Sequence, residues 1–171
     1  MLSKFKPTWM IESIFSITPQ FLLENHINCV LTDLDNTLIP WNSKKGSEEL
    51  RSWLHETRKY GVKVIVVSNN SHRRIHKAVK DYQLPIVPRA MKPLTIGIRH
   101  AIKEFGLKKQ NTVMVGDQLL TDVVAANSCR VRSILVKPLV NNDAWNTTIN
   151  RMMEKVIWNK LIKKYPNLHW E

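Results

Sequence analysis

Long hydrophobic runs, cysteine and acidic residues are all scarce in this sequence. No apolar run approaches the roughly 20 residues that a transmembrane helix needs, and residues 1–20 have no continuous apolar core of the signal-peptide type. Cys29 and Cys129 lie in apolar stretches without CxxC or Cys/His spacing, which argues against a disulfide framework or a zinc site. These absences favour a reduced, cytoplasmic setting.

The composition that remains is that of one basic, globular domain. Hydrophobic residues make up 43% and charged residues 23% of the chain, and 171 residues can form one domain with a full core. Lys and Arg total 26 against 14 Asp and Glu, so the formal net charge is +12. Such an excess attracts phosphorylated small molecules, anionic membranes or nucleic acid, although no RRM, KH or recognition-helix motif supports nucleic acid binding.

Strand-like apolar runs alternate with helical patterns from residue 27 onward. This alternation predicts an α/β fold with a doubly wound, Rossmann-like, mostly parallel sheet, in a single domain over residues 1–171. A long C-terminal helix is expected within residues 142–171, from Trp145 to Tyr165. The strand-like runs are 27–33, 63–70, 86–93, 112–116 and 131–138, and the helical patterns are 47–61, 72–84, 94–106 and 119–129.

Residues 1–24 precede the first predicted strand and have two interpretations. In one, an amphipathic helix rests on an anionic membrane, with Lys4 and Lys6 beside its apolar face. In the other, which is favoured, the segment packs on the core and closes one edge of the domain. The apolar residues that can share this helical face are Phe5, Trp9, Met10, Ile14 and Phe15.

Polar residues gather where the predicted strands end. Because ligands bind at the carboxyl ends of parallel strands, these residues are expected to face one another across one edge of the sheet. They are Asp33 and Asp35 after the first run, Ser68 and Asn69 after the second, Lys92 after the third, and Gly116, Asp117 and Asp122 after the fourth.

Such a cluster has a definite chemistry. The carboxylates of Asp33, Asp35 and Asp117 are hard oxygen ligands that suit Mg²⁺ together with a substrate phosphate. Lys92 and Ser68 add the positive charge and the hydrogen bonds of a phosphoryl pocket. One carboxylate can attack phosphorus to form an aspartyl phosphate, while a second exchanges a proton with the leaving group and with water.

Four segments resemble, in order, the motifs of the haloacid dehalogenase (HAD) superfamily of aspartate-nucleophile phosphotransferases. They are "DLDNTL" (33–38), "VVSNN" (66–70), "MKP" (91–93) and "GDQLLTD" (116–122). Residues 13–42 further resemble the YqeG-type group of subfamily IIIA, which is related to phosphatidylglycerophosphatase. The resemblance implies a magnesium-dependent phosphatase.

By position, the resemblance implies that Asp33 is the nucleophile and Asp35 the general acid/base, whose backbone carbonyl also reaches the metal. Lys92 would neutralise the charge of the aspartyl phosphate, and Asp117 would ligate Mg²⁺ together with Asp33 and Asp35. Asp122, beside Gly116, would orient the site from behind the metal ligands.

The resemblance also assigns substrate-binding residues. Ser68 would hold the phosphoryl oxygens with Asn69 alongside, and Thr37 would support the turn after the nucleophile. Many family members have glycine where this chain has Asn36, but asparagine tolerates a positive φ, so the turn is expected to survive.

No cap domain is expected over this site, because only residues 39–62 and 70–91 are available for the two usual insertions. An uncapped site is open to a bulky substrate. The resemblance favours phosphatidylglycerophosphate at a membrane face, with a soluble phosphorylated metabolite as the rival substrate. The alternative to an enzyme is a basic nucleic-acid- or protein-binding module with incidental catalysis.

Several other residues are candidates with a simpler interpretation. His72 and His76 stand one helical turn apart and are expected to be solvated rather than metal ligands. Arg73 and Arg74 either contact substrate or lie in a solvated helix start. Trp41 is expected to border the open pocket, whereas Trp145, Trp158 and Trp170 are expected to pack in the core or at its edge.

Overall fold

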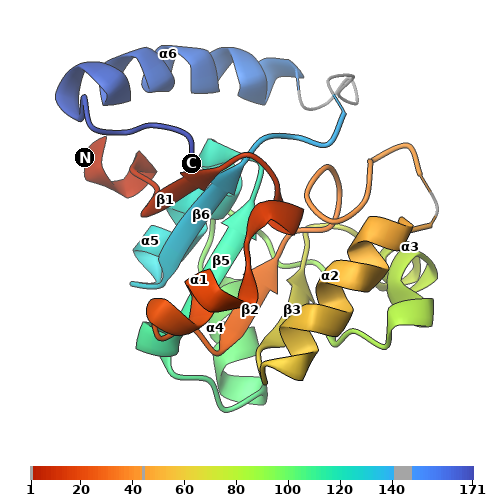
Figure 1. Ribbon diagram of the computed structural model, residues 1–171. Coiled ribbons are helices and arrows are strands. Elements are labelled where there is room, and N and C mark those ends of the chain that lie inside the picture. Colours follow the sequence, from red (N-terminus) through yellow and green to blue (C-terminus); the bar gives the residue numbers. More distant parts are fainter. Residues whose placement is uncertain (1, 44, 141–147) are drawn as a thin grey trace.

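The computed structural model describes residues 2–43, 45–140 and 148–171. In these residues, six parallel strands form one sheet in the order β1-β6-β5-β2-β3-β4. Figure 1 shows this sheet between layers of helices, which confirms the predicted doubly wound α/β fold. The strands are β1 (Trp9–Ile11), β2 (Cys29–Thr32), β3 (Lys63–Val67), β4 (Ile86–Val87), β5 (Thr112–Gly116) and β6 (Arg132–Val136).

Helices cover both faces of the sheet because side chains along each strand alternate between the two faces. In β3, Val64 and Val66 belong to the core beneath α1 (Pro19–Glu24), α2 (Glu48–Lys59) and α3 (His72–Val79). Ile65 and Val67 belong to the core on the opposite face, beneath α4 (Ile96–Glu104) and α5 (Val124–Ser128). The short helical turns are η1 (Leu2–Phe5), η2 (Ile14–Ser16), η3 (Lys80–Tyr82), η4 (Lys109–Asn111) and η5 (Leu119–Val123).

The C-terminal helix α6 (Thr148–Lys164) lies over the β1–β6 side of the sheet, beside the N-terminal segment (Figure 1). Leu161 of α6 is fully buried in a third apolar cluster with Met10 and Leu135. After α6 the chain returns to β1, where the Glu171 N–H donates to Met10 O at 2.8 Å and the Glu12 N–H donates to Glu171 O at 3.2 Å.

The N-terminal segment does not form the amphipathic helix of the less favoured interpretation. Trp9 lies in strand β1, Phe5 ends one 3₁₀ turn, and Ile14 begins another. Met10 and Ile14 are buried, at 2% and 0% exposure, so the single apolar helical face is wrong. The reason is tertiary: β1 pairs in parallel with β6, which places its side chains in two core clusters.

Several predicted boundaries also shift. The run 63–70 leaves the sheet after Val67, and the pattern 119–129 begins with a π-helical turn, η5, before α5. The final helix ends at Lys164 rather than at Tyr165, and Trp145 lies outside the described residues. The helix at 47–61 is confirmed as α2, which Ser47 caps by accepting the Leu50 N–H at 3.1 Å.

Two expected absences can be compared with the described part of the chain. Only α2 lies between β2 and β3, and only α3 and η3 lie between β3 and β4, so no cap domain is inserted there. None of the described helices combines the length and apolar character required to span a membrane.

Cys29 and Cys129 are free and buried, and burial raises the pKa of Cys29 to about 12.

We expect Ile65→Ala to lower the free energy of unfolding by about 2–5 kcal/mol, because it leaves a cavity in the core between β3 and α4. Lys63→Ala, at an exposed position of the same strand, should change it by less than about 0.5 kcal/mol. Urea denaturation with an unchanged m-value measures both. Equal losses in the two variants would contradict this account of the core.

Candidate active site

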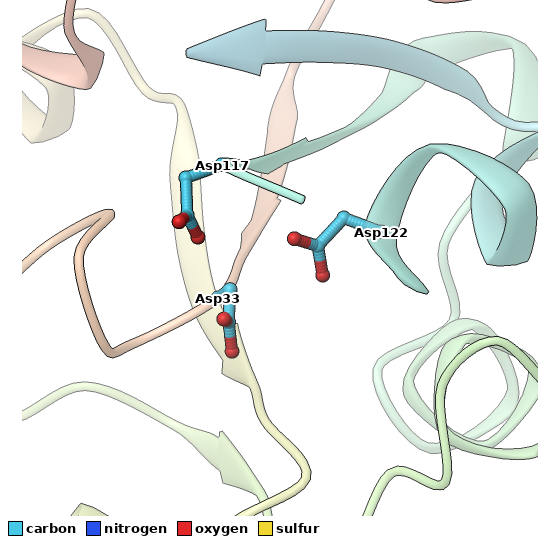
Figure 2. A group of neighbouring side chains, drawn as sticks. All are labelled: Asp33, Asp117 and Asp122. Atoms are coloured by element: carbon cyan, nitrogen blue, oxygen red, sulfur yellow. The ribbon is translucent and has the colours of Figure 1, made fainter. Parts of the chain in front are cut away.

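Three carboxylates converge at the carboxyl end of the sheet. Asp33 follows β2 and Asp117 follows the adjacent strand β5, and the Asp33 N–H donates to Val115 O at 3.0 Å. Asp122 lies in η5, which begins two residues after Asp117. Each of these aspartates offers an oxygen within 4.8 Å of the other two, and Figure 2 shows the three side chains beside one another.

Gly116 makes room for Asp122. A Cβ at position 116 would lie 2.2 Å from the Asp122 carboxylate, closer than any side chain can approach. The Gln118 N–H donates to Asp122 Oδ2 at 3.1 Å and fixes the carboxylate in this space. The glycine of "GDQLLTD" is therefore required by close packing.

Lys92 lies between two of the carboxylates. Its Nζ is 3.0 Å from Asp33 Oδ1 and 2.7 Å from Asp122 Oδ1, and the residue is only 5% exposed. Asn69 holds the Lys92 backbone at both ends: its Oδ1 accepts the Lys92 N–H at 2.7 Å, and its Nδ2 donates to Lys92 O at 2.9 Å. This geometry gives Asn69 a positioning role that its sequence position alone does not reveal.

The buried charges do not balance. Two carboxylates, those of Asp33 and Asp122, contact the single ammonium group of Lys92, and charge buried in protein is costly unless it is compensated. Burial raises the pKa of Asp122 to about 6, although the Lys92 ammonium favours its charged form. Burial alone would lower the pKa of Lys92, but Asp122 and Asp33 outweigh it and raise the pKa, so the lysine stays charged. The residual negative charge and the hard oxygen donors fit a divalent cation such as Mg²⁺.

Asp35 is held by other partners. Its Oδ1 lies 2.7 Å from Nη2 of Arg74, and its Oδ2 accepts a hydrogen bond from the Asn70 amide. Burial raises the pKa of Asp35, and Arg74 partly offsets this effect. Arg74 also donates to Ser43 O at 3.0 Å and to Trp41 O at 3.2 Å. The arginine thus joins α3, the loop after β2 and the carboxylate of Asp35.

The remaining predicted residues line the same edge of the sheet. The Thr37 hydroxyl donates to Asp117 Oδ1 at 3.3 Å, which links the turn after Asp33 to the third carboxylate. Ser68 is 1% exposed, and its Oγ accepts the Asn70 N–H at 3.3 Å. Asn36 has a φ of 61°, which confirms the expected positive φ in this turn.

The structure also places the weaker candidates. His72 and His76 are exposed and their rings stack with centroids 5.7 Å apart. Trp41 is 36% exposed in the loop after β2. Trp158 and Trp170 pack against the cluster around Leu161, as predicted for edge packing.

Family models match two adjoining parts of the chain. The model described as haloacid dehalogenase-like hydrolase matches residues 30–91, and the one described as HAD-hydrolase-like matches residues 90–156. Together they contain all the residues that Figure 2 draws as sticks.

Solved structures share the fold at low sequence identity. A cobalt-bound deoxy-D-mannose-octulosonate 8-phosphate phosphatase from Haemophilus influenzae is 14% identical and aligns with a TM-score of 0.52 over 82% of this chain and 94% of its own. The 3-deoxy-D-manno-octulosonate 8-phosphate phosphatase from Moraxella catarrhalis, in complex with magnesium, phosphate and KDO, is 12% identical and aligns with a TM-score of 0.50 over 86% and 94% of the two chains.

A curated relative matches along the whole length. The protein named "Probable phosphatase YqeG" from Bacillus subtilis (strain 168) is 37% identical over 172 residues, which cover 100% of this chain and 99% of the relative. The chain therefore belongs to the haloacid dehalogenase superfamily, as a YqeG-like phosphohydrolase without a cap domain.

Proposed function

We propose that this protein hydrolyses a phosphate monoester with the aid of Mg²⁺, through an aspartyl phosphate formed on Asp33. The observation that supports this most directly is the cluster of Asp33, Asp117 and Asp122, in which Lys92 contacts Asp33 and Asp122. Asp33 and Asp117 would hold the ion through their carboxylates and Asp35 through its backbone carbonyl, with Asp122 behind them. When bound, Mg²⁺ would draw negative charge from the phosphoryl oxygens.

The side chains can carry out two steps. A carboxylate oxygen of Asp33 attacks phosphorus, the bond to the ester oxygen breaks, and that oxygen takes a proton from Asp35. A water molecule then attacks phosphorus and gives a proton to Asp35, while the bond to Asp33 breaks and inorganic phosphate leaves. Lys92, 3.0 Å from Asp33, offsets charge on the reacting carboxylate, and Ser68 would hold a phosphoryl oxygen.

The substrate that we propose first is phosphatidylglycerophosphate. The resemblance to phosphatidylglycerophosphatases, the uncapped site and the net charge of +12 support it. The N-terminal apolar residues do not support this substrate, because Met10 and Ile14 are buried in the core and cannot contact a membrane. A screen of dispersed phosphatidylglycerophosphate against soluble phosphate esters tests the choice, and a clear preference for a soluble ester would replace it.

We expect removal of divalent ions with EDTA to abolish hydrolysis of an aryl phosphate, and added Mg²⁺ to restore it, because the carboxylate cluster needs a cation. Asp33→Asn should lower kcat by at least about 1,000-fold, because an amide cannot replace the nucleophile. Initial rates measure both effects. Asp81→Asn, the same change at an exposed position of η3, is the matched control and should retain full activity. Substantial hydrolysis by Asp33→Asn would falsify the proposed nucleophile.

We expect Gly116→Ala to lower kcat by about 100-fold, because the new Cβ must displace the Asp122 carboxylate by more than an ångström. Gly106→Ala is the control: its φ of 60° makes it strained, but no atom lies within 4 Å of its added Cβ. It should therefore lose about 1 kcal/mol of stability and no activity. Steady-state kinetics and urea denaturation separate the two effects.

We expect Arg74→Ala to lower kcat about tenfold for an alkyl phosphate and much less for an aryl phosphate. The arginine holds Asp35, and protonation of the leaving group matters most when that group is strongly basic. Arg73→Ala, at the exposed neighbouring position, should change neither rate. Equal losses for both esters would indicate a structural role for Arg74 instead.

A further inference from the structure

A pocket of about 280 Å³ adjoins the carboxylate cluster. Asp117 forms part of its wall, so the pocket and the proposed phosphoryl site share a residue. The rest of the wall comes from η5, the end of β6, α6 and the segment that follows α6. We call this cavity the α6 pocket; its main lining residues are Asp117, Leu119, Leu135, Lys155, Trp158 and Trp170.

Most of the wall is apolar. Leu119 and Leu135 belong to the buried cluster beneath α6. The rings of Trp158 and Trp170 lie with centroids 6.4 Å apart and planes 35° apart, too close together to admit a further ring between them. The two indoles therefore form one continuous side of the pocket.

Two charged groups at the pocket are already engaged. Lys137 Nζ is 2.6 Å from Glu12 Oε1 and lies 5.1 Å from the centre of the Trp170 ring. Glu154 Oε1 accepts the Leu120 N–H at 3.1 Å. A ligand can thus gain more from contact with leucine and tryptophan than from these charges.

The size of the pocket suits a small organic group. A cavity of about 150 Å³ lined by apolar side chains holds benzene, so the α6 pocket has room for a group at least that large. Concave, mostly apolar sites with a few polar groups at one end are typical of small-molecule binding. Here the polar end is Asp117.

We propose that the α6 pocket binds the apolar part of the alcohol that the substrate releases. This inference rests on the proposed phosphatase function and deepens it by assigning the leaving group, but it does not rest on phosphatidylglycerophosphate, whose phosphate is borne by a polar glycerol carbon. A phosphoryl group at Asp33 and Asp117 has the pocket beside it, so an ester with an apolar substituent can occupy both sites at once. Trp158 and Trp170 would then determine specificity.

Two esters with leaving groups of equal non-hydrogen atom count test the proposal: pentyl phosphate, which is apolar, and glycerol 1-phosphate, which is polar. We expect the wild-type protein with Mg²⁺ to favour pentyl phosphate by about tenfold or more in kcat/KM. Trp158→Ala should remove most of this preference and leave glycerol 1-phosphate hydrolysis nearly unchanged. Met152→Ala, at a 69% exposed position of the same helix, is the control and should retain the preference.

A second variant tests whether the effect of Trp158→Ala comes from the pocket or from weaker packing of α6. Lys155→Trp places a bulky ring at an exposed position on the wall of the pocket without removing a packed side chain. It should lower kcat/KM for pentyl phosphate and spare glycerol 1-phosphate. Calorimetric titration of Asp33→Asn with pentyl phosphate, alone and combined with Trp158→Ala, should show the same loss in binding without turnover.

The outcomes separate this inference from the proposed function. If the wild-type protein hydrolyses neither these esters nor an aryl phosphate, the phosphatase proposal fails and the pocket assignment with it. If it hydrolyses both esters at equal kcat/KM, or if both pocket variants keep the wild-type preference, only the pocket assignment is overturned.

Discussion

The convergence of three carboxylates, two of them in contact with the buried ammonium group of Lys92, governs this structure. Asp33 and Asp117 meet because β2 and β5 are adjacent parallel strands in register, and Asp122 joins them through the turn of η5. Such a concentration of charge is tolerable only with compensation, which Lys92 supplies in part. The lack of a Cβ at Gly116 and the amide of Asn69 are both explained by the need to hold these groups in place.

The two sides of the site around this cluster contain different kinds of groups. The loops after β3 and β4 position Lys92, while Asn70 of the loop after β3 and Arg74 of α3 hold the carboxylate of Asp35. The β5–β6 side offers Asp117 and the apolar cavity beneath α6. The polar contacts that hold Asp35 and Lys92 lie on one side of the site, and the apolar cavity lies on the other. Changes in α6 could therefore alter the leaving group that such a fold prefers without altering the reaction.

The sequence predicts the parallel core well because its strands are continuous runs of aliphatic residues, and the chemistry of a parallel sheet lies at its carboxyl ends. Asp33, Lys92 and Asp117 are identifiable from this pattern alone. The pattern does not reveal β1, because three residues at a sheet edge are too few to distinguish from a helical face. The sequence pattern also does not predict the Arg74–Asp35 ion pair or the hydrogen bonds between Asn69 and Lys92. Contacts between separate segments of the chain leave no periodic signal in the sequence.

The pairing of β1 with β6 has a consequence for synthesis of the protein. Thr8 and its partner Ser133 are 125 residues apart in sequence. A ribosome adds about 5–20 residues per second, so the N-terminal strand waits on the order of 6 to 25 seconds for its neighbour to be made. During that time Trp9, Met10 and Ile11 lack the packing against β6 that they have in the folded protein. The nascent chain is therefore expected to need protection at the apolar segment that forms β1.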